Sequence, residues 1–179
     1  MGVTETQEHF TRVYEAVYAD LVRFVVRRAG SDVAEDIAAE VLTVAWRRVH
    51  DLPDEIGQAR AWVFGIARRV LLAHHRTSRG AFPVELGAVP VPGHEDTVAV
   101  VTDLVRAWRL LPARHQEALA LTVWEGLSGA QAAEVLGISP VAYRVRLSRA
   151  RTSLRALLDH QPPAPASDVV ALTDRTCAR

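Results

Sequence analysis

The sequence predicts an all-α fold, with two small helical domains joined by a flexible linker. Apolar residues recur at helical spacing through most of residues 9–158. Only 6% of the residues are aromatic, and Ala, Val, Leu and Arg dominate, which suits helices. The periodicity stops in a stretch rich in proline and glycine. We therefore expect a first domain over 1–77, a linker over 78–97, a second domain over 98–159 and a disordered tail over 160–179.

The apolar pattern predicts three helices in the first domain, over residues 9–28, 33–49 and 59–76. Asp32 and Glu35 have the spacing of a capping box at the start of the second helix. The breakers Pro53 and Gly57 place a loop before the third helix. Gly65 inside that helix costs about 1 kcal/mol relative to alanine, so we expect another helix to cross closely there.

The second domain is predicted to hold helices over 98–111 and 113–124, followed by a helix-turn-helix over Ser128–Arg155. Ser128 and Gln131 form a capping box for the first helix of this motif. Gly137 suits the left-handed residue that ends it. Ser139 caps the second helix, and Pro140 occupies its first position, where a missing N–H costs nothing.

The second helix of the motif has two distinct faces. Its packed face holds Tyr143, Leu147, Ala150, Leu154 and Leu158. Its other face holds Arg144, Val145, Ser148, Arg149, Thr152 and Arg155. In a helix-turn-helix the second helix enters the DNA major groove. The pattern alone also fits a helical hairpin whose arginine face is merely solvated.

The charges balance overall but are unevenly distributed. The chain has 21 basic residues, all of them arginine, and 21 acidic residues. Residues 126–158 hold five arginines against Glu134 alone, whereas residues 1–76 carry a net charge of −1. Proteins that bind DNA unaided are usually basic, since phosphate neutralisation supplies most sequence-independent affinity. We therefore expect another macromolecule to supply part of the DNA binding.

Several other classes of protein are not favoured by the sequence. Cys177 is the single cysteine, which excludes an intramolecular disulfide and a cysteine-rich zinc site. The sequence shows no membrane-spanning apolar run and no signal peptide, so we expect a cytoplasmic protein. His74, His75 and His115 invite an enzyme hypothesis, but no carboxylate or cysteine set at ligand spacing accompanies them. We expect no enzyme, metal or cofactor.

Five stretches, in order, resemble the extracytoplasmic-function (ECF) sigma factors of bacterial RNA polymerase. They are LVRFVVRR (21–28), AEDIAAEVLTVAWRR (34–48), ARAWVFGIARRVL (59–71), LPARHQEALALTVWEGLS (111–128) and LGISPVAYRVRLSRARTSLR (136–155). The resemblance implies that the first domain opens the promoter −10 element and that the second reads the −35 element. It would also account for the balanced charge, because such a protein binds promoter DNA as part of the polymerase holoenzyme.

The resemblance also implies protein partners. Core RNA polymerase is expected to bind through its β′ clamp helices and its β flap. The acidic helix that docks on the β′ clamp helices corresponds here to the segment with Asp36 and Glu40, and Arg47 matches its basic end. In this family an anti-sigma factor often holds the two domains, and the predicted linker permits such a partner here.

By the same resemblance, residues that face the bases of the −35 element fall on Arg144, Val145, Ser148 and Arg149, a set that agrees with the periodicity. Arg146 and Arg151 are expected to contact phosphates. For the −10 element the family captures a flipped base between the loop at 52–58 and the third helix. The residues expected to act there are Arg60, Phe64, Arg68 and Arg69. Trp62 is expected in the core, and Phe64 is either a core residue or a stacking platform.

The sequence departs from the family pattern in three places. Arg69 stands where the family commonly has asparagine, so the base that this chain prefers to flip can differ from the family's usual one. The loop before the third helix is acidic, with Asp51, Asp54 and Glu55. In the docking helix Ala39 and Leu42 replace a frequent Gln and a frequent Phe. The main alternative is a helix-turn-helix regulator that acts without polymerase, although it leaves the match over 21–71 unexplained.

Overall fold

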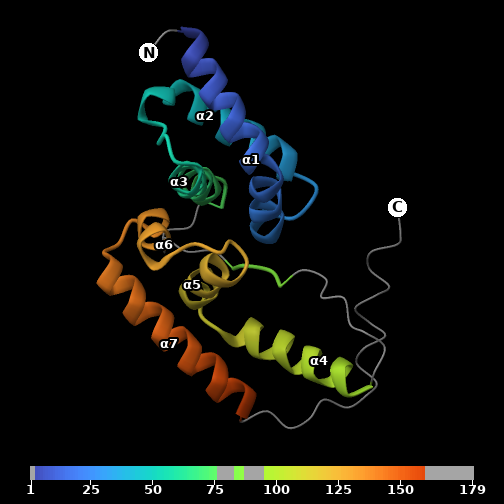
Figure 1. Cartoon of the computed structure of the whole chain (residues 1–179). Coiled ribbons are helices and arrows are strands. Elements are labelled where there is room, and N and C mark those ends of the chain that lie inside the picture. Colours follow the sequence, from blue (N-terminus) through green and yellow to red (C-terminus); the bar gives the residue numbers. More distant parts are fainter. Residues whose placement is uncertain (1–2, 76–82, 87–94, 160–179) are drawn as a thin grey trace.

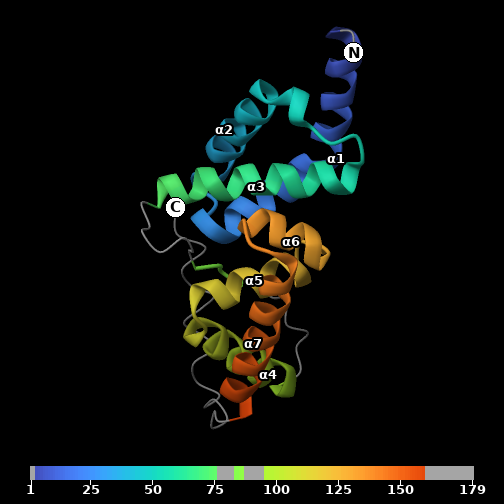
Figure 2. The same ribbon diagram turned by 90° about the vertical axis from the view of Figure 1, so that its left-hand side faces the viewer.

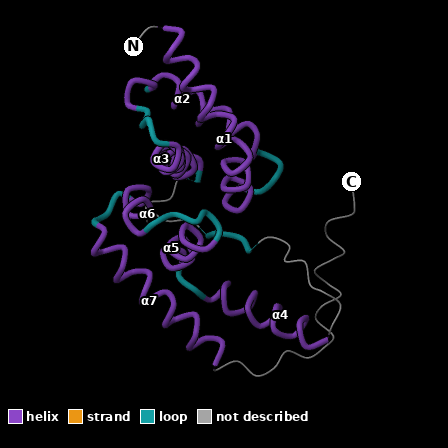
Figure 3. Tube along the Cα trace, in the orientation of Figure 1, coloured by secondary structure: helices purple, strands orange, loops and turns teal. Residues whose placement is uncertain are grey.

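The protein is all-α, as predicted. A computed structural model describes residues 3–75, 83–86 and 95–159, and no strand occurs within them (Figures 1 and 3). The helices of an N-terminal unit are α1 (Val3–Ala29), α2 (Ala34–Arg47) and α3 (Ile56–His74), with a 3-10 turn at Val49–Asp51. Those of a C-terminal unit are α4 (Glu95–Leu110), α5 (Ala113–Val123), α6 (Gly129–Leu136) and α7 (Pro140–Asp159). The predicted tail at 160–179 lies outside the described residues.

In the N-terminal unit two helices begin earlier than the periodicity predicted. Helix α1 begins at Val3 instead of His9. Helix α3 begins at Ile56, because the Glu55 carboxylate accepts hydrogen bonds from the backbone N–H of Gly57 and Gln58, both at 2.8 Å. Such a cap satisfies donors that a helix start otherwise leaves unpaired. The acidic loop residue Glu55 thus serves the helix itself.

The predicted capping box at the start of α2 is wrong. Val33 is the N-cap residue and makes no side-chain cap hydrogen bond. The Asp32 carboxylate instead accepts a hydrogen bond from the Ser31 hydroxyl at 3.1 Å. The acidic residues of the first turn, Glu35 and Asp36, still favour the positive end of the helix dipole.

The helix-turn-helix forms as its local sequence predicts. Ser128 and Gln131 make both bonds of the capping box at α6. Gly137 follows α6 with φ 66°, a left-handed conformation that glycine adopts without steric cost. The Ser139 hydroxyl accepts a hydrogen bond from Ala142 N–H at 3.1 Å and caps α7. These contacts span four residues or fewer, so the sequence around the turn is enough to specify it.

Part of the predicted linker is anchored. Val84 is buried, and its N–H donates to Gln116 Oε1 at 3.0 Å. The Trp108 indole donates to the Val84 carbonyl at 2.6 Å. The next residue, Glu85, donates its N–H to the Arg27 carbonyl at 2.7 Å. Residues 83–86 therefore bridge α1 and the C-terminal unit, and α4 begins at Glu95, inside the range that was expected to be linker.

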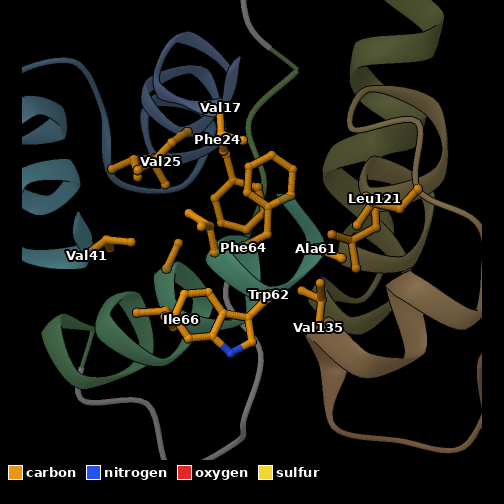
Figure 4. Close-up of a cluster of buried hydrophobic side chains, with 14 of the residues drawn as sticks. Val17, Phe24, Val25, Val41, Ala61, Trp62, Phe64, Ile66, Leu121 and Val135 are labelled. Atoms are coloured by element: carbon orange, nitrogen blue, oxygen red, sulfur yellow. The ribbon is translucent and has the colours of Figure 1, made fainter. Parts of the chain in front are cut away.

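One hydrophobic cluster spans both units, and a second cluster lies in the C-terminal unit together with Val84. Helix α3 packs across α6 (Figures 1 and 2), and its Arg68 side chain reaches Glu117 of α5. Phe24 and Phe64 stack within the N-terminal unit, with ring centroids 4.7 Å apart. From the same cluster, Ala61 and Trp62 of α3 lie against Leu121 and Val135 of the C-terminal unit (Figure 4). We call this packing the closed arrangement.

Gly65 lies where α3 meets α6, as predicted, but a side chain fits there. A Cβ added to Gly65 would be 4.0 Å from the Val135 Cα and 3.6 Å from an Arg69 nitrogen, both ordinary contacts. Gly65→Ala is therefore expected to raise the free energy of unfolding by about 1 kcal/mol, because alanine favours the helix. Thermal unfolding of the full chain measures this, and a lower melting temperature would contradict it.

Candidate nucleic-acid interface

One face of α7 holds the helix in its unit. Tyr143 and Ala150 are fully buried, and Leu147 and Leu154 are partly buried. The Tyr143 hydroxyl donates to the Ala118 carbonyl at 2.8 Å and lies 2.6 Å from the Thr122 hydroxyl. Burial raises the pKa of Tyr143, so its hydroxyl remains a donor. Leu158, expected in the packed face, is instead 38% exposed.

The opposite face of α7 is exposed and cationic. Exposed side chains include Arg144, Val145, Ser148, Arg149 and Arg151, whereas Arg146 is half-buried. Among the described residues none of these arginines forms a salt bridge. By contrast, Arg27, Arg28, Arg60 and Arg68 of α1 and α3 all pair with carboxylates. Helix α7 thus presents a cationic surface that no described carboxylate neutralises, as an anionic ligand requires.

A groove of about 680 Å³ separates this face from the start of α5. It is lined by Arg114, His115, Ala142, Val145, Arg146, Ser148, Arg149, Thr152 and Ser153. No carboxylate is among the lining residues. Burial, and then the charges of Arg114, Arg146 and Arg149, lower the pKa of His115. The imidazole is therefore neutral at neutral pH.

The residues expected to act at the −10 element lie along α3, and three of them already make contacts with other side chains of the protein. Phe64 is fully buried against Phe24 of its own unit, which makes it a core residue instead of a platform for a base. The Arg60 side chain binds Asp20 at 2.8 Å, and the Arg68 side chain binds Glu117 at 2.8 Å. Arg69 is exposed and donates to the Gly65 carbonyl at 3.0 Å.

Two buried carboxylates of the C-terminal unit hold the N-terminal unit. Glu125 binds Arg27 at 2.8 Å and Arg28 at 3.2 Å, and its carbonyl also accepts a hydrogen bond from Arg60. Glu117 binds Arg68. Burial lowers the pKa of Arg28 to about 10 although Glu125 opposes this, so the guanidinium stays charged at neutral pH. Sequence analysis missed both carboxylates, because no local pattern marks a pair separated by 97 residues.

The residues expected to dock on polymerase share the exposed side of α2. Asp36, Glu40 and Arg47 are exposed, whereas Ile37 and Val41 on the other side are buried. Glu40 pairs with His74 of α3 at 2.8 Å. Trp46, which the sequence analysis did not single out, is 46% exposed and stands edge-on to Phe10. The exposed surface of α2 therefore combines acidic groups with an exposed aromatic ring.

The described part of the chain holds neither a cluster of metal-binding side chains nor a membrane-spanning helix. No three His, Cys, Asp or Glu side chains there could hold a metal ion together. No described helix is long and apolar enough to cross a membrane.

Comparison with known proteins places this geometry in a family. The family model for sigma-70 region 2 matches residues 13–80, and that for sigma-70 region 4 matches residues 102–154. The chain is 30% identical over 153 residues to the ECF RNA polymerase sigma factor SigL of Mycobacterium tuberculosis, covering 82% of this chain and 86% of SigL. It is an ECF sigma factor. To SigC of M. tuberculosis it is 35% identical over 159 residues, covering 83% of this chain and 81% of SigC.

A solved structure agrees with this assignment. The sigma factor RpoE of Bartonella quintana, in complex with the anti-sigma factor NepR, matches with a TM-score of 0.59 and 26% identity, covering 89% of this chain and all of RpoE. This ECF sigma factor thus directs transcription initiation by RNA polymerase. A helix-turn-helix regulator that acts without polymerase is not favoured, because it does not account for the match to sigma-70 region 2.

Proposed function

We propose that α7 reads the −35 element with Arg144, Val145, Ser148 and Arg149, while Arg146 and Arg151 bind phosphates. The observation that supports this is the cationic face of α7, whose arginines have no carboxylate partner among the described residues. An arginine donates two hydrogen bonds to guanine O6 and N7, a pattern that specifies the base pair. Ser148 and Val145 add a hydroxyl donor and an apolar surface for a thymine methyl group.

The −10 element is proposed to bind α3 after the closed arrangement opens. Arg60 and Arg68 are the cations offered to the single strand. Opening releases Arg68 from Glu117 and Arg60 from the Glu125 carbonyl, whereas Arg60 keeps its pair with Asp20 of its own unit. Arg69 is already exposed. Phe64 is left out of this proposal, because its stacking partner Phe24 belongs to the same unit and remains in place when the units separate.

The test of this function is reconstitution. The purified chain is mixed with core RNA polymerase, and the holoenzyme is footprinted on genomic fragments and assayed for transcripts. Because the polymerase and the chromosome share the cytoplasm, we place the protein there. The expected result is initiation from a defined set of promoters with protection at both elements. Failure to bind core enzyme would contradict the proposal.

Docking on polymerase is proposed to use the exposed side of α2, with the β′ clamp helices as its partner. Asp36→Arg places a cation where a carboxylate is expected to meet basic residues. We expect this change to weaken binding to core polymerase by roughly 10- to 100-fold, since like-charge contacts at an interface cost several kcal/mol at most. Binding of a fluorescent chain to core enzyme measures it.

The matched control is Glu15→Arg, which makes the same change of charge on an exposed position of α1. It is expected to leave the affinity for core polymerase unchanged. Equal weakening by both variants would show that net charge, and not the α2 surface, governs the interaction.

We also propose an anti-sigma factor as a partner, along with the β flap of the polymerase for the C-terminal unit. The support is the match to RpoE, which was solved with the anti-sigma factor NepR. A partner that binds the closed arrangement would keep Arg68 and Arg60 of α3 engaged. Co-purification from the native host, followed by inhibition of the reconstituted holoenzyme, tests this.

A further inference from the structure

We infer that Arg114 and His115, at the start of α5, form with Arg146 of α7 a clamp for one DNA phosphate at the edge of the −35 element. The inference rests on the proposed −35 reading by α7. It extends the DNA contact to a second helix and assigns two residues that neither periodicity nor the family resemblance singled out.

The first observation is the histidine itself. His115 is 8% exposed and lines the groove between α5 and α7. Its Nδ1 is buried and has no hydrogen-bond partner, and no other described residue bonds the ring. A buried polar group without a partner costs about 1–3 kcal/mol. Because protonation would add a second unpaired donor at Nδ1, the neutral ring is favoured, and its Nε2–H is available as a donor to a ligand in the groove.

The second observation is the charge around the ring. Arg114 contributes from α5, and Arg146 and Arg149 contribute from α7. These are the charged groups whose fields act on His115, and all are positive. The other polar groups of the groove are the hydroxyls of Ser148, Thr152 and Ser153, which also donate to phosphate oxygens. A site with cations, neutral donors and no carboxylate fits a phosphate diester.

The third observation is the position of the site. In the first turn of α5 the backbone N–H groups of Arg114 and His115 lie at the positive end of the helix dipole, which favours an anion. The His115 N–H is already bonded to the Pro112 carbonyl at 2.7 Å. The groove is continuous with the exposed face of α7 through Val145 and Arg149. A strand of the duplex whose bases meet α7 would therefore pass its backbone over α5.

The test uses the imidazole as a reporter. The ring resonances of His115 in the full chain are titrated against pH by NMR, with and without a duplex of mixed sequence. A phosphate within hydrogen-bonding distance favours the charged ring, so the duplex is expected to raise the pKa of His115 by about one or more. The ring resonances of His74, which pairs with Glu40 outside the groove, are the internal control and should not shift on addition of the duplex.

Binding of the duplex at several salt concentrations gives an independent readout. Arg114→Ala is expected to weaken binding equally for all sequences and to lower the salt slope by about 1, as loss of one phosphate contact requires. Arg109→Ala, an exposed arginine of α4 outside the groove, is the control and should change neither. Inorganic phosphate tests whether the groove takes an isolated anion, and a rise in the pKa of His115 with phosphate alone would also support the clamp.

Two outcomes would overturn the inference, and only the second would also contradict the proposed −35 reading by α7. If the duplex shifts the resonances of α7 but leaves the pKa of His115 and the salt slope of Arg114→Ala unchanged, the clamp is wrong and the −35 face stands. If a duplex that carries the −35 element footprinted by the holoenzyme also shifts no resonance of α7, the proposed −35 reading fails, and the clamp fails with it.

Discussion

Glu125→Gln is expected to shift the chain from the closed arrangement to an open one. The Glu125 and Arg28 side chains are each 1% exposed, and Arg27 and Arg28 both pair with this carboxylate. Removal of one partner of a buried ion pair typically costs 3–5 kcal/mol, because the other charge stays buried without compensation. These bonds join α1 to the turn after α5, so the cost falls on the packing between the units. A cost of about 3 kcal/mol lowers the closed-to-open ratio by roughly 100-fold.

Energy transfer between dyes on α2 and α7 measures the opening, and the affinity for core polymerase measures its consequence. We expect a longer dye separation and tighter binding to core polymerase. Glu134→Gln, the same change at an exposed position of α6, is the control. Circular dichroism checks that both variants keep their helices. Unchanged dye separation in folded Glu125→Gln would show that the carboxylate does not hold the units together.

Arg149→Ala is expected to change which −35 sequences the holoenzyme uses. Arg149 is exposed, lies opposite Tyr143 on α7 and has no carboxylate partner among the described residues. A bidentate contact to a guanine is worth about 1–3 kcal/mol of discrimination, or roughly 5- to 150-fold. We therefore expect the preference at one base pair to disappear while the preferences at the other positions remain.

Transcription by reconstituted holoenzyme from promoters with a randomised −35 element measures this preference. Arg151→Ala, on the flank of α7, is the comparison, because loss of a phosphate contact should reduce transcription from all promoters by the same factor. Equal loss across the whole library for Arg149→Ala would reassign Arg149 to the DNA backbone.

The sequence was most informative where the contacts are local. The capping box of Ser128 and Gln131, the left-handed Gly137 and the Ser139 cap involve neighbouring residues, so the helix-turn-helix follows from its own residues. Helical periodicity also predicted which side of α7 packs against its unit and which side is exposed. Periodicity was less reliable at helix ends, since Glu55 caps α3 earlier than expected and Asp32 does not cap α2. Caps depend on backbone conformation, which residue type only biases.

Only the tertiary structure decided how the two units meet. The sequence showed a stripe of apolar residues on α3. It did not show that α6 covers Ala61 and Trp62 or that Phe64 stacks on Phe24. Glu117 and Glu125 read as ordinary acidic residues until folding buried them beside Arg68 and Arg28. A buried charge is stable only with a partner, and that partner lies far away in the chain. The sequence by itself therefore determined the helices and the exposed, arginine-rich side of α7, whereas the ion pairs that engage α3 were decided by long-range packing.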